Sequence, residues 1–195
     1  MISEYYNSLG IKPESGYSDE ISDNTNFLQN IVNDENIKSV LEIGFHWGHS
    51  SDTFLRSNKE AMVTSFDIGH PNISLGREYL SKKYGERHTL IIGNSKESIP
   101  QFISSNPDVK FDLIFIDGGH LYDVVKSDME NCMKLAHENS ILILDDVIFD
   151  KRYEASWTRD PTKVWNEFLS NNRIVQDGYK FFRGGRGLVW GKYIL

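Results

Sequence analysis

VLEIGFHWGHSSDTFL (residues 40–55) is the stretch of sequence that decides the fold. It begins as a short apolar run, reaches two glycines, Gly44 and Gly48, and continues into a segment of helical character. Glycine lets the backbone approach a ligand closely, and free N–H groups at the start of a helix favour anionic groups. The pattern, with Glu42 inside the run, predicts a strand, a ligand-binding turn and a helix. The same glycines could also serve only to turn the chain.

The chain on both sides repeats this alternation of short apolar runs and helix-length segments. The runs are continuously apolar, as expected for strands covered on both faces. Strands separated by helices imply βαβ units and a mostly parallel sheet. We expect strands at 39–43, 62–67, 88–92, 111–116 and 140–144, and helices at about 22–34, 50–57, 74–84, 95–104 and 121–137.

The ends of the chain depart from the alternation. Residues 1–35 are expected to form an arm, irregular to residue 20, followed by the first helix, and 36–150 the ligand-binding core. In 151–195 we expect a loop, a helix near 161–170, and strands near 173–182 and 187–193 around the hairpin signal GGRG at 184–187. The fold class is therefore α/β: an open, seven-stranded, mostly parallel sheet with helices on both faces and an antiparallel C-terminal edge hairpin. One domain, 1–195, is the most economical organisation.

The composition excludes several classes of protein. The chain has 195 residues and a formal net charge of −7, which argues against a general nucleic-acid or anionic-membrane binder because these need a surplus of Lys and Arg. The local basic group Lys180, Arg183 and Arg186 is expected to be a solvated turn. The single cysteine, Cys132, excludes an internal disulfide. With no signal peptide and no apolar run near the roughly 20 residues of a membrane span, we expect a cytoplasmic protein.

Polar residues follow the expected strands, and ligands of open parallel sheets bind at the carboxyl ends of the strands. Asp67 closes the second strand, about 20 residues after the glycine turn, where an acid accepts hydrogen bonds from ribose hydroxyls; it could also be only a cap. After the third strand, Gly93 permits close approach, and Asn94 or Ser95 could bond a purine edge. Ser95 could equally be the N-cap of the next helix.

Five stretches together resemble class I S-adenosylmethionine-dependent methyltransferases, in the right order and over about residues 38–150. They are VLEIGFHWGHSSDTFL, SFDIG, GNSKESIPQF, FDLIFIDGGHLYD and ILILDDV. In detail the chain resembles the metal-dependent O-methyltransferases, both the catechol type and the macrolide sugar type. Many class I enzymes carry a further glycine where this chain has His46, and the catechol-type turn also lacks it. The resemblance implies a Rossmann-like fold and S-adenosylmethionine as cofactor.

The resemblance assigns the strand ends to parts of this cofactor. Glu42, Gly44 and Gly48 would line its methionine end. Asp67 would hold the ribose, and Ser95 would contact the adenine. The full set of expected cofactor contacts is Glu42, Gly44, Gly48, Ser50, Asp67, Ile68, Asn94, Ser95 and Asp117.

Three carboxylates should converge at the ends of the fourth and fifth strands: Asp117, Asp145 and Asp146. Neighbouring strands lie about 5 Å apart, so unpaired carboxylates there would repel one another and raise one another's pKa. A hard dication removes this conflict, and an all-oxygen site with room for water suits Mg²⁺. In the enzymes that the chain resembles, the matching acids are metal ligands. The alternative is that Asp146 caps a turn and Asp117 contacts only the cofactor.

The Asp-Gly-x-His pattern from Asp117 to His120 resembles the sugar O-methyltransferases, whose histidine at this position serves as general base. An imidazole of near-neutral pKa can take a hydroxyl proton during methyl transfer. We therefore expect His120 and Asp117 to be catalytic, and the acceptor to be a small molecule with an aliphatic or sugar hydroxyl.

The acceptor should lie over the ends of the fourth and fifth strands. Side chains of the arm and of the loop 150–160 could stack on or clamp it, although aromatic loop residues are as often anchors that pack the loop down. These candidates are Tyr5, Tyr6, Tyr17, Tyr153, Trp157 and Arg159. A second subunit of a homodimer could complete the acceptor site.

The main prediction is therefore Mg²⁺-assisted O-methylation, with three alternatives. One keeps the cofactor and drops the metal, with N- or O-transfer by positioning and His120 alone. Another is a catalytically silent module of the same fold that binds a partner protein, against which the three converging acids argue. A nicotinamide oxidoreductase is disfavoured, because Gly44-x-x-x-Gly48 lacks the close second glycine of that fingerprint.

Overall fold

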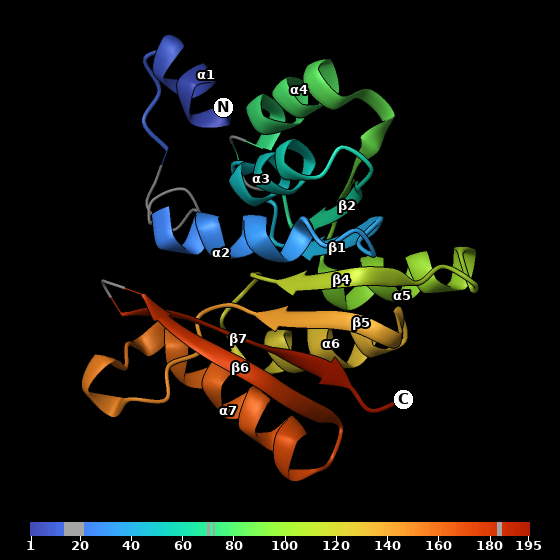
Figure 1. Ribbon diagram of the computed structural model, residues 1–195, viewed down its shortest axis with the longest axis vertical. Helices are drawn as coiled ribbons and strands as arrows, with labels where there is room; N and C mark the ends of the chain where they lie inside the picture. Colours follow the sequence, from blue (N-terminus) through green and yellow to red (C-terminus); the bar gives the residue numbers. More distant parts are fainter. Residues whose placement is uncertain (14–21, 70, 72, 183–184) are drawn as a thin grey trace.

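Seven strands form one sheet in the computed structural model, which describes residues 1–13, 22–69, 71, 73–182 and 185–195. The spatial order of the strands is β3-β2-β1-β4-β5-β7-β6 (Figure 1). The first five strands are parallel, whereas β7 is antiparallel to both of its neighbours. Their bounds are β1 (Ser39–Ile43), β2 (Met62–Asp67), β3 (His88–Ile92), β4 (Phe111–Ile116), β5 (Ala136–Leu144), β6 (Ile174–Phe182) and β7 (Arg186–Tyr193). The predicted fold class is confirmed.

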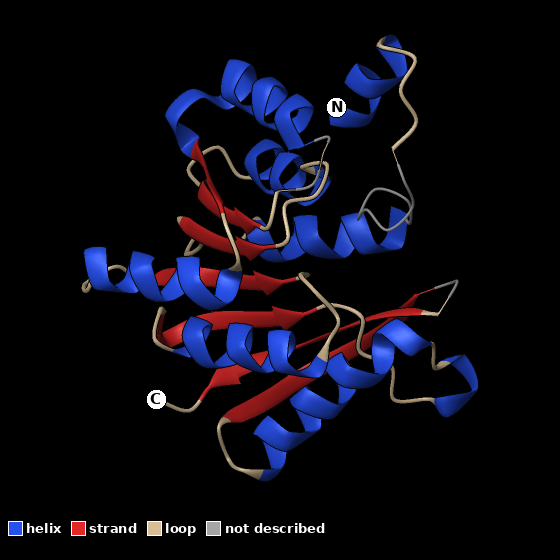
Figure 2. Cartoon of the chain, turned by 180° about the vertical axis from the view of Figure 1, so that it is seen from behind, coloured by secondary structure: helices blue, strands red, loops and turns tan. Residues whose placement is uncertain are grey.

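Helices cover both faces of the sheet, as Figures 1 and 2 show from opposite sides. One face carries α2 (Ser22–Val32), α3 (His49–Ser57) and α4 (Ile73–Tyr84), and the other carries α5 (Ser95–Ser105), α6 (Tyr122–Met133) and α7 (Ser156–Ser170). Two 3₁₀ turns complete the described elements, η2 (Gly85–Arg87) and η3 (Lys151–Tyr153). Among these helices none has the length and apolarity needed to cross a bilayer.

The expectation of an irregular arm to residue 20 is wrong at its start, because residues 2–8 form the helix α1 (Ile2–Ser8). Ile2 and Tyr6 lie four positions apart on one face of this helix and are fully buried. The Tyr6 hydroxyl donates to the carbonyl oxygen of Trp47 at 2.7 Å, and the Ile2 amide donates to Asp52 at 3.1 Å. The arm therefore packs behind the glycine turn.

Three other expected boundaries differ by four residues or more. Strand β5 begins at Ala136 rather than 140, and helix α6 ends at Met133 rather than 137. Helix α7 begins at Ser156 rather than near 161, because the side chain of Thr158 accepts a hydrogen bond from the amide of Ala155 at 3.0 Å and starts the helix one turn before Pro161. Among the residues named from the sequence, Tyr17, Arg183 and the first glycine of the GGRG signal lie outside the described residues.

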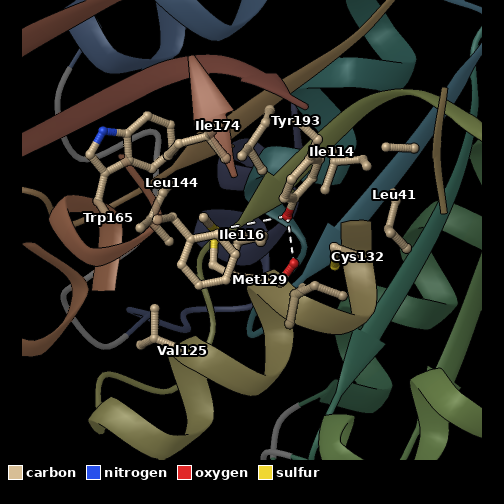
Figure 3. Packing of buried hydrophobic residues seen from close by; sticks show 14 of the residues in the cluster. Leu41, Ile114, Ile116, Val125, Met129, Cys132, Leu144, Trp165, Ile174 and Tyr193 are labelled. Atoms are coloured by element: carbon tan, nitrogen blue, oxygen red, sulfur yellow. Dashed lines mark hydrogen bonds between the residues drawn. The ribbon is translucent and has the colours of Figure 1, made fainter. Parts of the chain in front are cut away.

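A hydrophobic cluster between the sheet and the α5–α7 face holds the site-bearing strand ends in place (Figure 3). Side chains of β4, β5 and α6 interdigitate there, and Cys132 is fully buried among them. The hydroxyl of Tyr193 donates to the carbonyl oxygen of Met129 at 2.9 Å, which joins β7 to α6. The cluster thus fixes α6 against the strands whose ends form the site.

Candidate active site

The loops at the carboxyl ends of the parallel strands surround a cavity of about 740 Å³, a size typical of small-molecule sites. Its walls come from the segments that follow β1 to β5, from α6 and α7, and from the first residue of β7. Most of the expected cofactor residues belong to the lining: Gly44, Ser50, Asp67, Ile68, Asn94, Ser95 and Asp117. The structure therefore brings these residues, from the ends of the four strands β1 to β4, to one edge of the sheet.

The glycine turn depends on both of its glycines. Gly44 has φ +97°, and a Cβ atom there would lie 1.9 Å from the carbonyl oxygen of Asp117. Gly48 has φ +80° and would bring a Cβ atom to 2.7 Å from the ring of Phe45. Between them His46, with φ +49°, takes a conformation that side chains rarely adopt. Gly48 itself is not part of the lining, so it shapes the turn rather than the cavity wall.

Glu42 does not line the cavity, contrary to the role expected for it at the methionine end. Its side chain is fully buried and accepts hydrogen bonds from the hydroxyls of Ser50, Ser51 and Ser65, the last at 2.6 Å. Burial raises the pKa of this carboxyl, and the three serine hydroxyls oppose that rise. Because these hydroxyls donate to the Glu42 carboxylate inside the core, Glu42 supports the start of α3 from within the fold.

Asp67 ties the end of β2 to the glycine turn. One carboxylate oxygen accepts from the backbone amides of Phe45 at 3.0 Å and His46 at 2.8 Å, and the other accepts from the amide of Gly69 at 2.8 Å. The side chain is half-buried and also lines the cavity. The capping role is thus present, and the ribose contact stays a prediction.

The N-cap of α5 is Asn94 and not Ser95. The Asn94 side chain accepts from the amide of Lys96 at 3.2 Å, and Ser95 is the first residue of the helix. Both residues line the cavity beside Lys96. The alternative in which Ser95 caps the helix is therefore wrong, and its side chain instead lowers the pKa of the neighbouring Asp128.

The end of β4 and the end of β5 bring an acidic cluster together with a histidine. The Nε2 atom of His120 lies 2.8 Å from a carboxylate oxygen of Asp146. Asp117, His120 and Asp146 each present one ligand atom, and these atoms lie within 4.8 Å of one another. Asp145 is outside this group and outside the lining, because its carboxylate turns to accept the backbone amide of Asp146 at 2.8 Å.

This arrangement perturbs the ionisation of the cluster. Burial, and then the charges of Asp145 and Asp146, raise the pKa of Asp117 well above its usual range. Burial and the neighbouring Asp146 raise the pKa of Asp145 to about 8. The hydrogen bond to Asp146 raises the pKa of His120, while Arg186 lowers the pKa of Asp117 and of Asp145. Without a cation, the buried acids therefore favour their protonated form, and a bound cation would favour the charged form instead.

Of the expected acceptor residues that the structure describes, only Trp157 lines the cavity. The ring of Tyr153 packs on Phe181 with a centroid distance of 4.7 Å, and the guanidinium of Arg159 pairs with Glu154 at 2.8 Å. In the arm, Tyr6 is buried and Tyr5 stacks on Tyr79. These side chains anchor the segments that carry them, because each is already engaged by a neighbour.

Several residues of the cavity were missed by the sequence reasoning. Arg186 was expected on a solvated turn, but β7 delivers it to the cavity. Trp47 and Lys96 were assigned no role, and neither was Asp128, which is 1% exposed on α6. An acid in the otherwise buried face of a predicted helix was the available signal for Asp128. Nothing in the local sequence distinguishes Arg186 from an exposed arginine.

Comparison with known proteins agrees with this geometry. Residues 41–147 match the sequence model of a family described as "Methyltransferase domain", and no curated protein matches the chain. Similar structures include an O-methyltransferase from Bacillus cereus with SAH: 17% identity, 97% of this chain, 88% of that chain and a TM-score of 0.75. The O-methyltransferase TomG from Streptomyces achromogenes with SAM is 13% identical, with a TM-score of 0.77. The match covers 98% of this chain and 87% of that chain. CalS11, a TDP-rhamnose 3'-O-methyltransferase of calicheamicin biosynthesis, is 18% identical, with a TM-score of 0.63. The match covers 85% of this chain and 76% of that chain.

Proposed function

Because the chain belongs to the methyltransferase-domain family, we propose that it transfers a methyl group from S-adenosylmethionine to a hydroxyl oxygen of a small-molecule acceptor. The observation that carries the proposal is the His120–Asp146 pair, which lies in the same cavity as the glycine turn and Asp67. A donor site and a proton acceptor therefore share one enclosure.

The methyl donor would span the strand ends from β1 to β3. The turn at Gly44 leaves room for the methionine end, and Asp67 would accept from the ribose hydroxyls while holding the turn. Ser95 and its neighbours would enclose the base. The structures with SAM or SAH bound have the same fold, which supports this placement.

The reaction needs a base for the acceptor hydroxyl. As the acceptor oxygen bonds to the methyl carbon, the methyl–sulfur bond breaks and the sulfonium becomes a neutral thioether. The hydroxyl proton would pass to Nδ1 of His120, since Nε2 faces Asp146. Asp146 would orient the ring and stabilise the imidazolium, as its effect on the pKa of His120 indicates.

The acidic cluster also suits a divalent cation. Two carboxylates with little compensating positive charge favour a cation between them, and we propose Mg²⁺ held by Asp117 and Asp146, with Asp145 behind them. A bound Mg²⁺ would lower the pKa of the acceptor hydroxyl and orient its oxygen. A site that also used His120 as ligand would suit Mn²⁺ or Zn²⁺ better than Mg²⁺.

For the acceptor we favour a sugar hydroxyl. The indole of Trp157 is half-exposed at the cavity and offers an apolar face to a sugar ring. CalS11 acts on TDP-rhamnose, so the fold accommodates such an acceptor. Arg186 would add positive charge beside the acidic cluster.

Calorimetric titration with S-adenosylmethionine and S-adenosylhomocysteine tests the donor. Absence of binding to either compound would refute the proposed function. The role of His120 is tested with His120→Ala. If His120 is the base, the variant loses turnover and keeps its affinity for Mg²⁺ and for S-adenosylhomocysteine. Loss of Mg²⁺ binding in the same variant would make His120 a ligand instead.

A further inference from the structure

Helix α6 begins two residues after His120, and its N-cap position holds an apolar residue. That residue, Leu121, has no side-chain atom that could accept a hydrogen bond, whereas Ser, Thr, Asp or Asn usually occupies such a position. The carboxylate of Asp160 takes this part, because the amide of Tyr122 donates to it at 3.0 Å. This amide belongs to the first residue of α6, where the N–H groups have no carbonyl partner inside the helix. Asp160 comes from α7, so one helix caps the other.

Further contacts from α7 hold the same tyrosine. The two helices pack side by side. The Tyr122 hydroxyl donates to Glu167 at 2.6 Å, and the ammonium of Lys163 lies 4.3 Å from the centre of the Tyr122 ring. Asp160, Lys163 and Glu167 are spaced three and four positions apart, so they lie on one face of α7. This face therefore meets Tyr122 from its backbone amide to its hydroxyl.

The loop that carries His120 is held mainly at its two ends. Among the described residues, the amides of Gly118, Gly119 and His120 donate no hydrogen bond to the backbone, and the two glycines have no side chains to anchor the loop. At one end the Asp117 amide donates to the carbonyl oxygen of the last residue of β1 at 2.8 Å. At the other end α6 packs on the loop, where a Cβ atom on Gly119 would lie 3.2 Å from Val124. The position of α6 therefore determines where His120 lies.

The first turn of α7 also carries a residue of the cavity. Trp157 lies three positions before Asp160 and lines the same cavity as His120. This turn of α7 thus reaches the proposed acceptor contact directly and the proposed base through the cap of α6. A displacement of only about 1 Å would break the hydrogen bond between Nε2 of His120 and Asp146, which is 2.8 Å long.

We propose that Asp160 is a positioning residue, which caps α6 from α7 and thereby holds His120 against Asp146 in the orientation that base catalysis needs. This inference rests on the proposed function, because it concerns the base of the same reaction. Asp160 lies outside the cavity lining, so it would act through Tyr122 and His120. Its loss should release the imidazole and leave the donor site, on the β1–β3 side of the cavity, unchanged.

The test needs no acceptor and uses EDTA-treated protein, so that no cation competes for Asp146. NMR signals of the His120 ring are recorded at pH 9, with Asp146→Ala as the spectrum of the released ring. In Asp160→Ala these signals should shift from the wild-type positions to those of the released ring. In Asp160→Asn they should stay at the wild-type positions, since the amide oxygen still accepts from Tyr122. Hydrogen exchange of the Tyr122 amide at neutral pH should be at least ~5-fold faster in Asp160→Ala than in the wild type.

Glu167→Ala is the matched control, because it removes another contact between α7 and Tyr122 and leaves the cap in place. Its His120 signals should stay at the wild-type positions. If Glu167→Ala and Asp160→Ala move these signals equally, Asp160 only joins the two helices, and the proposal is overturned. Should Asp160→Ala fail to fold, Asp160→Leu provides the same measurement without the acceptor oxygen.

Calorimetric titration with S-adenosylhomocysteine separates the inference from its premise. Asp160→Ala should bind this compound within about twofold of the wild-type affinity, because the two sites are distant; a larger loss would show a disturbance of the whole cavity and overturn the inference. Absence of binding to the wild type defeats the proposed function itself. Unmoved His120 signals in Asp160→Ala overturn the role of Asp160 and leave the donor assignment standing. Identical His120 signals in the wild type and Asp146→Ala also overturn it, because Asp146 would then not hold the ring.

Discussion

Replacing Asp128 by asparagine should make the ligand-free protein more stable, although the residue lies in the interior. The substitution keeps the shape of the side chain and removes a buried charge that Ser95 and Lys96 offset only in part. Burial moves the pKa of Asp128 from 3.8 to about 6, and two pKa units correspond to about 3 kcal/mol. The folded protein favours the protonated form of Asp128. The cost in stability of burying its charged form is therefore absent below the pKa in the unfolded chain and complete above the pKa in the folded protein. Asp128→Asn should therefore raise the free energy of unfolding by up to about 3 kcal/mol at pH 8, and by only about 1 kcal/mol at pH 4.5.

Asp52 is the matched control, since it is also 1% exposed but accepts several hydrogen bonds. It accepts from the hydroxyl of Tyr84 at 2.6 Å, from Lys83 at 3.2 Å and from the amide of Ile2 at 3.1 Å. Asp52→Asn should lower the free energy of unfolding by about 2 kcal/mol, because it weakens charge-assisted hydrogen bonds. Urea denaturation of both variants at pH 8 and pH 4.5, without ligand, makes the measurement. Destabilisation by Asp128→Asn at pH 8 would show that Ser95 and Lys96 stabilise the carboxylate by more than its burial costs, and the reasoning would then be wrong.

Other consequences concern the turn, the base and the cation. Gly44→Ala should abolish S-adenosylhomocysteine binding and lower the melting temperature, because its Cβ atom would collide with the carbonyl oxygen of Asp117; calorimetry and thermal denaturation check this, and unimpaired binding would contradict it. Since base catalysis needs neutral His120 and Asp146 raises its pKa, kcat should fall as pH drops through that raised pKa. In Asp146→Asn this fall in kcat should occur at lower pH. If the residual activity of the variant falls at the same pH as that of the wild type, His120 is excluded as the base. Dialysis against EDTA should lower turnover and added Mg²⁺ restore it, whereas unaffected turnover would remove the metal from the proposal. Trp157→Ala should raise the acceptor KM severalfold with unchanged S-adenosylhomocysteine affinity, and weaker S-adenosylhomocysteine binding would place the indole at the donor.

The sheet could be predicted because its strands are short apolar runs with clear ends. Four of the five parallel strands begin and end where the sequence places them, and the antiparallel hairpin follows from the break in the alternation. Helix α1 was not predicted, because Ile2 and Tyr6 are buried together only when the helix packs against the glycine turn. A short helix of this kind has little stability without tertiary packing.

The site was predicted as a set of strand ends but not in the orientation of each side chain. Asp145 and Asp146 are adjacent, and only the left-handed backbone of Asp146, at φ +58°, separates their directions. One carboxylate therefore meets His120 while the other folds back onto the main chain. Backbone conformations of this kind are set by the surrounding fold. The sequence therefore identifies both acids as candidates but does not indicate which of them meets His120.

The position of β7 has a consequence for how the protein is made. This strand follows β6 in the chain, but in space it separates β6 from β5 and carries Arg186 into the cavity. On a ribosome, β6 would emerge before its partner strand β7, and the edge of β5 would stay uncovered until β7 is made. Newly made chains should therefore pass through a stage with two open strand edges, the form most exposed to pairing with other chains. When β7 pairs, it covers the edge of β5 and one edge of β6 and supplies Arg186 in a single event. A chain that has acquired its arginine has therefore also left its most aggregation-prone stage behind.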